Sequence, residues 1–93
     1  MFIQDDIKEN IPLFLVELYH RTQGDASVRV SMFDIGESLG LDRTLSLRTA
    51  EELIGTGLAE IKTLSGIIGI TTDGVTEARQ LGASLKDNKE FKI

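Results

Sequence analysis

The stretch LAEIKTLSGIIGITTDG, residues Leu58 to Gly74, decides the fold because it joins two short strands to the start of a helix. In both strands apolar residues fall at alternate positions, which is the pattern of a half-buried strand. Gly66, in the loop between them, supplies the positive φ of a tight hairpin. Thr71 or Thr72 then caps a helix whose first turn holds Asp73, where the helix dipole favours an anion. We therefore expect a β-hairpin that runs directly into a helix.

Two short helices are expected immediately before this hairpin. Ser31 precedes MFDIGESLG, with Asp34 three residues later in a helix-starting capping pattern. Gly36 inside this helix indicates the close approach of another helix, since no side chain stands in the way. The next helix runs through TLSLRTAEELIGTG, residues 44–57, and glycines end it. Its predicted buried stripe recurs at three- and four-residue spacing and consists of Leu47, Ala50, Leu53 and Ile54.

The N-terminal part predicts one helix and one strand. In NIPLFLVELYHRTQG, Asn10 is expected to cap the helix, Pro12 to lie in its first turn and Gly24 to end it. This helix is apolar over much of its circumference, so we expect it to be central and buried. QDDIKE before it is either a separate turn or a kinked extension. SVRVS, residues 27–31, alternates as a short strand does.

The complete order is helix, strand, helix, helix, strand, strand, helix, which predicts a mainly α fold with a small antiparallel β-sheet. We expect one domain over residues 1–93, with its core within about residues 10–85. KDNKEFKI at the C-terminus is expected to fray. The last helix has its apolar stripe at Val75, Ala78, Leu81 and Leu85.

Composition argues against several classes of function. The chain has no cysteine and one histidine, so we expect no metal, no cofactor and no disulfide. No nucleophile or phosphate-loop setting occurs, and His20 is expected at a helix end, so we expect no enzyme. Acids at the N-terminus are unlike a signal peptide, and no apolar run reaches the roughly 20 residues that span a bilayer. These features favour a cytoplasmic protein that does not enter membranes.

IGESLGLDRTLSLRTAEELIGTGLAEI, Ile35 to Ile61, resembles the winged helix-turn-helix core of bacterial transcription regulators. GITTDGVTEARQL, Gly69 to Leu81, is similar to the passage from the second wing strand into the final helix of that family. The resemblance covers roughly residues 10–85 and implies DNA binding by a small transcriptional regulator, although many winged helices are protein-interaction modules. The matching features are Gly36, Leu39, Gly40, Leu41, the polar cap Asp42, and Gly57 with Leu58.

The resemblance implies that the helix at residues 44–57 enters the major groove and presents its outward side chains to double-stranded DNA. Arg48 is the best base reader, because its guanidinium fork can bind guanine at two points. The other candidates on or just before this helix contact phosphates or bases, and two wing residues complete the predicted DNA-binding set: Arg43, Thr44, Ser46, Thr49, Lys62 and Ser65.

Charge leaves the alternative function open. The net charge of −5 falls entirely within residues 1–42, and residues 43–93 carry seven charges of each sign. An acidic chain is repelled by phosphate. Glu52 follows Arg48 by four residues, so this arginine is equally consistent with a solvated ion pair. Lys62 is the only base in the hairpin and Glu60 offsets it. A protein-interaction module that does not bind DNA is therefore the second hypothesis.

Apolar residues raise two further expectations. Leu64 at the loop tip is either a single exposed apolar side chain or, with Leu45 and Ile67, a contact for a protein partner. A homodimer is expected if DNA is the target, because two-fold assembly doubles the contacts. Its contacts are expected on the first and last helices, near four apolar residues without a clear core role: Phe2, Ile3, Phe91 and Ile93.

Overall fold

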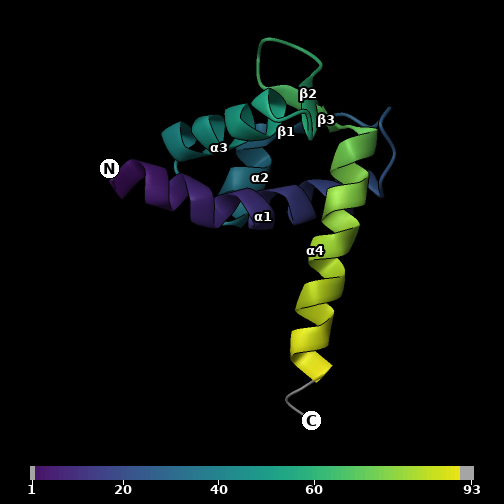
Figure 1. The fold of residues 1–93 in the computed structure, drawn as a ribbon. Coiled ribbons are helices and arrows are strands. Elements are labelled where there is room, and N and C mark those ends of the chain that lie inside the picture. Colours follow the sequence, from purple (N-terminus) through teal and green to yellow (C-terminus); the bar gives the residue numbers. More distant parts are fainter. Residues whose placement is uncertain (1, 91–93) are drawn as a thin grey trace.

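The computed structural model describes residues 2–90 of the chain, with side chains from residue 7 to residue 82. Seven elements follow one another in the predicted order, which confirms a mainly α fold with a small antiparallel sheet. Helix α1 packs against α2, α3 and α4, and the far end of α4 projects away from the other elements (Figure 1). The elements are α1 (Phe2–Thr22), β1 (Val30–Ser31), α2 (Met32–Ser38), α3 (Arg43–Gly55), β2 (Ala59–Ile61), β3 (Ile67–Ile70) and α4 (Thr72–Glu90).

Residues 4–9, QDDIKE, are a helical extension and not a separate turn, so helix α1 begins before the predicted cap Asn10. It runs without interruption from Phe2 to Thr22, so Pro12 lies inside the helix and Asn10 is not its N-cap. A proline inside a helix removes one backbone hydrogen bond and costs about 3 kcal/mol. Burial offsets this cost at about 2 kcal/mol for each large apolar side chain. The predicted central burial of this helix is confirmed, because three of its side chains are fully buried: Phe14, Leu15 and Leu18.

Strand β1 is shorter than the predicted strand at residues 27–31, because a turn occupies the residues before it. The Asp25 carboxylate accepts hydrogen bonds from the backbone N–H of Ser27 at 2.9 Å and from its hydroxyl at 2.7 Å. These two bonds lower the pKa of Asp25 below its ordinary value. The Val28 N–H donates to the Asp25 carbonyl at 3.2 Å, so it is already used within the turn.

The sheet has the order β1-β3-β2, with both pairings antiparallel. In the central strand, Ile68 lies opposite Val30, and Ile70 lies opposite Ala59. Both of these isoleucines are fully buried, so the sheet contributes one side of the core. Gly66, the loop residue immediately before β3, has a φ of +105°, which confirms the positive φ predicted for the hairpin loop.

Helices α2 and α3 meet at a glycine, as predicted. A Cβ atom on Gly36 would lie 2.6 Å from the Ser46 Cβ and would also overlap its hydroxyl oxygen. Both helices begin at predicted caps. The Ser31 hydroxyl accepts from the N–H groups of α2's first turn, and the Asp42 carboxylate accepts from the Leu45 N–H at 2.8 Å. The caps and the glycine together fix how α3 lies against α2.

The buried stripe of α3 matches the prediction at Ala50 and Leu53 and differs from it at its other two positions. The apolar spacing places Leu47 inside, yet Leu47 is 40% exposed, and Ile54 is half-buried. Gly36 admits only a small side chain from α3, and Ser46 fills that place. The helix is therefore rotated so that the inward positions follow Ser46 at three- and four-residue spacing. The buried stripe consists of Ser46, Thr49, Ala50 and Leu53.

Helix α4 begins at the predicted cap. The Thr71 hydroxyl accepts from the Gly74 N–H at 3.0 Å, and it donates to the Gly57 carbonyl at 2.6 Å. Of the predicted stripe, Ala78 is buried and the side chain of Leu85 lies outside the described residues. The helix continues to Glu90, and the expected fraying of the C-terminal residues stays a prediction. The side chains of Phe2 and Ile3, and residues 91–93, also lie outside the described part of the chain.

Candidate interaction surface

The exposed side of α3 carries three of the five DNA-binding residues predicted for this helix. Arg43, Thr44 and Arg48 are all exposed. The other two predicted residues of this helix, Ser46 and Thr49, are 1% and 0% exposed. Their predicted outward orientation is wrong, because the contact with Gly36 turns this side of α3 into the core. Both residues therefore belong to the packed side of α3 and not to its exposed surface.

The two buried hydroxyls of α3 differ in their hydrogen bonding. The Ser46 hydroxyl donates to the Asp42 carbonyl at 2.8 Å, within the first turn of the helix. The Thr49 hydroxyl oxygen is buried without a hydrogen-bond partner among the described residues. A buried hydroxyl without a partner destabilises a fold by about 1–3 kcal/mol. Thr49 is therefore a weak point in the packing of α3.

Arg43 connects α3 to α2 through an aromatic ring. Its guanidinium carbon lies 3.9 Å from the centre of the Phe33 ring, which is a cation–π geometry. A guanidinium over an aromatic face can still offer the N–H groups at its edge to a carboxylate. Arg43 is therefore partly structural and still presents a positive charge at the surface.

Arg48 does not form the ion pair with Glu52 that the sequence left open. Two ion pairs occur within the described residues, Arg21 with Glu17 and Lys62 with Glu60. Arg48 belongs to neither, and its side chain is exposed. It is therefore an unpaired positive charge with respect to the residues that the structure describes.

The β2–β3 hairpin carries little positive charge. The Lys62 ammonium donates to the Glu60 carboxylate at 2.9 Å, so the only base of the hairpin is neutralised by its neighbour. The Ser65 and Thr63 hydroxyls bond to each other at 2.8 Å. Leu64 between them is 97% exposed. The tip of the hairpin therefore carries no charge and exposes one large apolar side chain.

A groove of about 430 Å³ lies between α3 and the hairpin, and we call it the α3–hairpin groove. Four large apolar side chains are exposed within residues 7–82, and three of them line this groove: Leu47 at 40%, Ile61 at 52% and Leu64 at 97%. Three further residues of α3 also line it: the oppositely charged Arg43 and Glu51, and the half-buried Ile54.

Sequence reasoning finds one of these apolar residues and misses two. It groups Leu64 with Leu45 and Ile67, which are half-buried and are not part of the groove lining. Leu47 and Ile61 take their place. The alternating pattern assigns Ile61, the last residue of β2, to the buried face of the sheet. The apolar spacing of α3 assigns Leu47 to the core, because leucine is ordinarily buried. The small residue opposite Gly36 is the signal that points to the correct rotation of α3.

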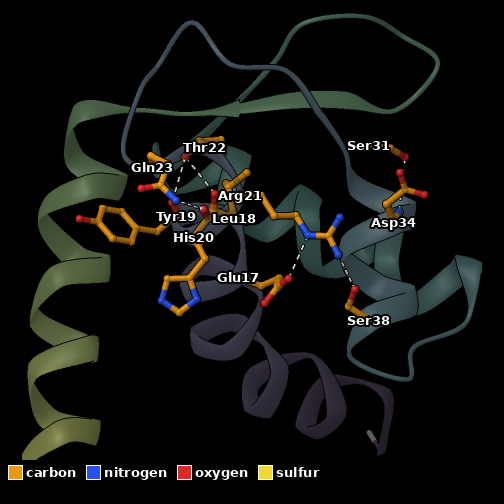
Figure 2. Close-up of polar contacts among 10 residues, drawn as sticks. All are labelled: Glu17, Leu18, Tyr19, His20, Arg21, Thr22, Gln23, Ser31, Asp34 and Ser38. Carbon is orange, nitrogen blue, oxygen red and sulfur yellow. Dashed lines mark hydrogen bonds and ion pairs between the residues drawn. The ribbon is translucent and has the colours of Figure 1, made fainter.

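A polar cluster joins α1 to α2, and none of its residues lines the α3–hairpin groove (Figure 2). The Arg21 Nε donates to the Glu17 carboxylate on the same helix at 2.9 Å, and the Arg21 Nη2 donates to the Ser38 hydroxyl. His20 is exposed beside Tyr19, with ring centres 6.1 Å apart, and its carbonyl accepts from the Gln23 side chain. Through the bond to Ser38, this cluster attaches α1 to α2.

No helix in the described part of the chain is both long and apolar enough to cross a bilayer. Residues 7–82 include no set of three or more histidine or acidic side chains arranged to share a metal ion. Comparison with protein-family models, with curated proteins and with solved structures gives no match to this chain.

Proposed function

We propose that this chain is a protein-interaction domain that binds its partner in the α3–hairpin groove. The observation that carries the proposal is the clustering of Leu47, Ile61 and Leu64 around one groove. Contiguous exposed apolar surface on a small domain is typical of a binding site, and its removal from water favours association. Arg43 and Glu51 at the same groove add charges of both signs, which help to align a partner.

We also propose that the domain is a winged helix-turn-helix. The predicted order of seven elements supports this family, as does the short connection of residues 39–42 between α2 and α3. The β2–β3 hairpin then corresponds to the wing and α3 to the recognition helix. Within this family the function depends on the surface that these two elements expose, and here that surface is more apolar than basic.

DNA binding is the second candidate, and the exposed arginines favour it. Arg48 is exposed and without an ion pair to any described residue, and Arg43 and Thr44 are also exposed in the first half of α3. Against this candidate stand the burial of Ser46 and Thr49 and the net charge of −5. A duplex carries one negative charge per about 1.7 Å of its axis, so a neutral, apolar wing is a poor match for it.

A titration against mixed-sequence duplex DNA at two salt concentrations separates the candidates. We expect no detectable binding even at low salt. Binding that weakens steeply with salt, and that loses sequence preference in Arg48→Ala, would overturn the protein-interaction proposal in favour of DNA. An Arg79→Ala variant, altered on the exposed surface of α4, is the matched control for loss of one positive charge.

A fluorescent apolar dye tests the groove itself, in dilute protein. We expect dye binding in the wild-type chain and a loss of at least fivefold in the Leu47→Ser variant. Leu13→Ser is the matched control, because Leu13 on α1 is 48% exposed but is not part of the groove lining. An equal loss in both variants would contradict the proposal that the groove is the apolar binding site of this domain.

A further inference from the structure

The exposed side of α3 has a symmetric arrangement of charge around one leucine. Arg43, Leu47 and Glu51 are spaced by four residues, so they form one row along the helix, and all three line the α3–hairpin groove. Each charged residue is about 6 Å along the axis from Leu47, at 1.5 Å per residue. The row therefore reads positive, apolar and negative from the N-terminal end of α3.

This row is complementary to itself when reversed. If a second α3 lies antiparallel across the first, with the two-fold axis at Leu47, each Arg43 faces the other chain's Glu51. The two Leu47 side chains then face each other. A two-fold interface requires this kind of pairing, because a contact from residue i to residue j implies the reverse contact as well. Two ion pairs and one apolar contact thus follow from three residues.

We propose that the occupant of the α3–hairpin groove is a second copy of this chain, docked through antiparallel α3 helices. The inference rests on the proposed function and names its partner. The charge row supports a second copy over an unrelated partner, because the same three residues satisfy both sides. Neither charge is otherwise engaged in an ion pair with a described residue.

The hairpin enlarges this interface. Its loop extends beyond α3 (Figure 1), and Leu64 at the tip is almost fully exposed. In the two-fold arrangement the hairpins flank the paired helices, where Ile61 and Leu64 contribute further apolar area. The interface remains small, so we expect a weak dimer with a dissociation constant in the range of about 10–100 μM. The dimer covers the outward side of α3, and it therefore competes with any ligand of Arg48.

Sedimentation of the full chain between about 5 and 500 μM, a range that brackets the expected dissociation constant, measures the association. We expect a shift from monomer to dimer with concentration, and a loss of at least tenfold in association constant for Leu47→Asp. The matched control Leu13→Asp, which changes an exposed leucine on α1 outside the groove lining, should dimerise as the wild-type chain does. A wild-type chain that stays monomeric at the highest concentration, or a dimer that Leu13→Asp breaks and Leu47→Asp does not, would overturn the proposal.

Charge reversal tests the antiparallel register. Arg43→Glu and Glu51→Arg each place like charges opposite one another at two points, so each variant alone should associate at least tenfold more weakly. An equimolar mixture of the two variants restores opposite charges at both points, and it should form a heterodimer. Failure of the mixture to associate, with both variants folded by circular dichroism, would exclude this register and the proposal with it.

The outcomes for the two proposals differ. If the chain stays monomeric while the dye still distinguishes Leu47→Ser from Leu13→Ser, the second copy is excluded and the groove remains a site for another protein. If the dye does not distinguish these variants, the proposed function fails. If the chain dimerises, dye binding should also fall as protein concentration rises, because the second copy occupies the groove.

Discussion

The inward face of α3 carries Ser46 and Thr49, whereas its outward face carries Leu47 between Arg43 and Glu51. An ordinary amphipathic helix places its leucines inside and its hydroxyls outside. Here the close contact with Gly36 requires a small residue inside, and that requirement determines the rotation of the whole helix. A leucine that such a contact displaces to the surface is available to a partner.

Among substitutions at the contact between α2 and α3, the largest effect is expected at Gly36, where the inward face of α3 is tightest. Gly36→Ala places a methyl group 2.6 Å from the Ser46 Cβ, so we expect a loss of about 2 kcal/mol in the free energy of unfolding. Urea denaturation followed by circular dichroism measures it. Gly55→Ala is the matched control, because a Cβ there meets nothing within 4 Å and should leave stability unchanged or slightly raised.

A second substitution sharpens this test. Removing the opposing side chain by Ser46→Gly gives the alanine at position 36 room, although glycine in a helix costs about 1 kcal/mol. We therefore expect the double variant to be at least about 1 kcal/mol more stable than the sum of the two single effects indicates. Strict additivity would mean that the two positions do not touch, contrary to the close packing of α2 and α3.

The sequence predicts those parts of this fold that depend on neighbours along the chain. The cap at Ser31, the cap at Thr71 and the turn at Gly66 each depend on a few adjacent residues, and all three are confirmed. The approach of α3 to Gly36 is also predictable, because a glycine inside a helix lowers its stability and close packing against a second helix offsets that loss. The element order follows from these local signals.

The parts that the sequence does not predict depend on contacts between distant elements. Pro12 indicates a helix start, but burial of the side chains around it stabilises a longer helix through the proline. Leu47 and Ser46 are adjacent in α3, and the three- and four-residue spacing of this helix is compatible with either side chain facing the core. Only the partner helix decides between them, and for this reason the sequence pattern does not reveal the groove.

A stabilising substitution is expected on the inward face, at Thr49. Valine has nearly the same shape and lacks the hydroxyl that has no partner among the described residues, so Thr49→Val should raise the free energy of unfolding by about 1 kcal/mol. Thr22→Val is the matched control, because the Thr22 hydroxyl is also buried but donates to the Leu18 carbonyl at 2.9 Å. That variant should lose about 1 kcal/mol. Equal effects at both positions would contradict the difference in hydrogen bonding.

A smaller loss of stability is expected at Arg43, the first residue of α3. Arg43→Ala removes the cation–π contact with Phe33, which is worth about 0.5–1 kcal/mol at an exposed site. Arg48→Ala removes an arginine of the same helix that has no such contact, and it should change stability by less than about 0.5 kcal/mol. Thermal unfolding of the two variants at one protein concentration compares them. If Arg48→Ala is the more damaging change, the stacking on Phe33 does not stabilise the fold.

A small effect on stability is also expected on the outward face, at Leu47. Leu53→Ala, further along α3, truncates a fully buried side chain and should cost about 3 kcal/mol. Leu47→Ala makes the same chemical change at a side chain that is 40% exposed, and in dilute protein it should cost less than about 1 kcal/mol. At high protein concentration the wild-type chain should gain stability by mass action and Leu47→Ala should gain less, because only the wild-type groove holds its partner well. A Leu47→Ala loss equal to that of Leu53→Ala in dilute protein would place this leucine in the core, and the outward face of α3 would then have no apolar centre to offer a partner.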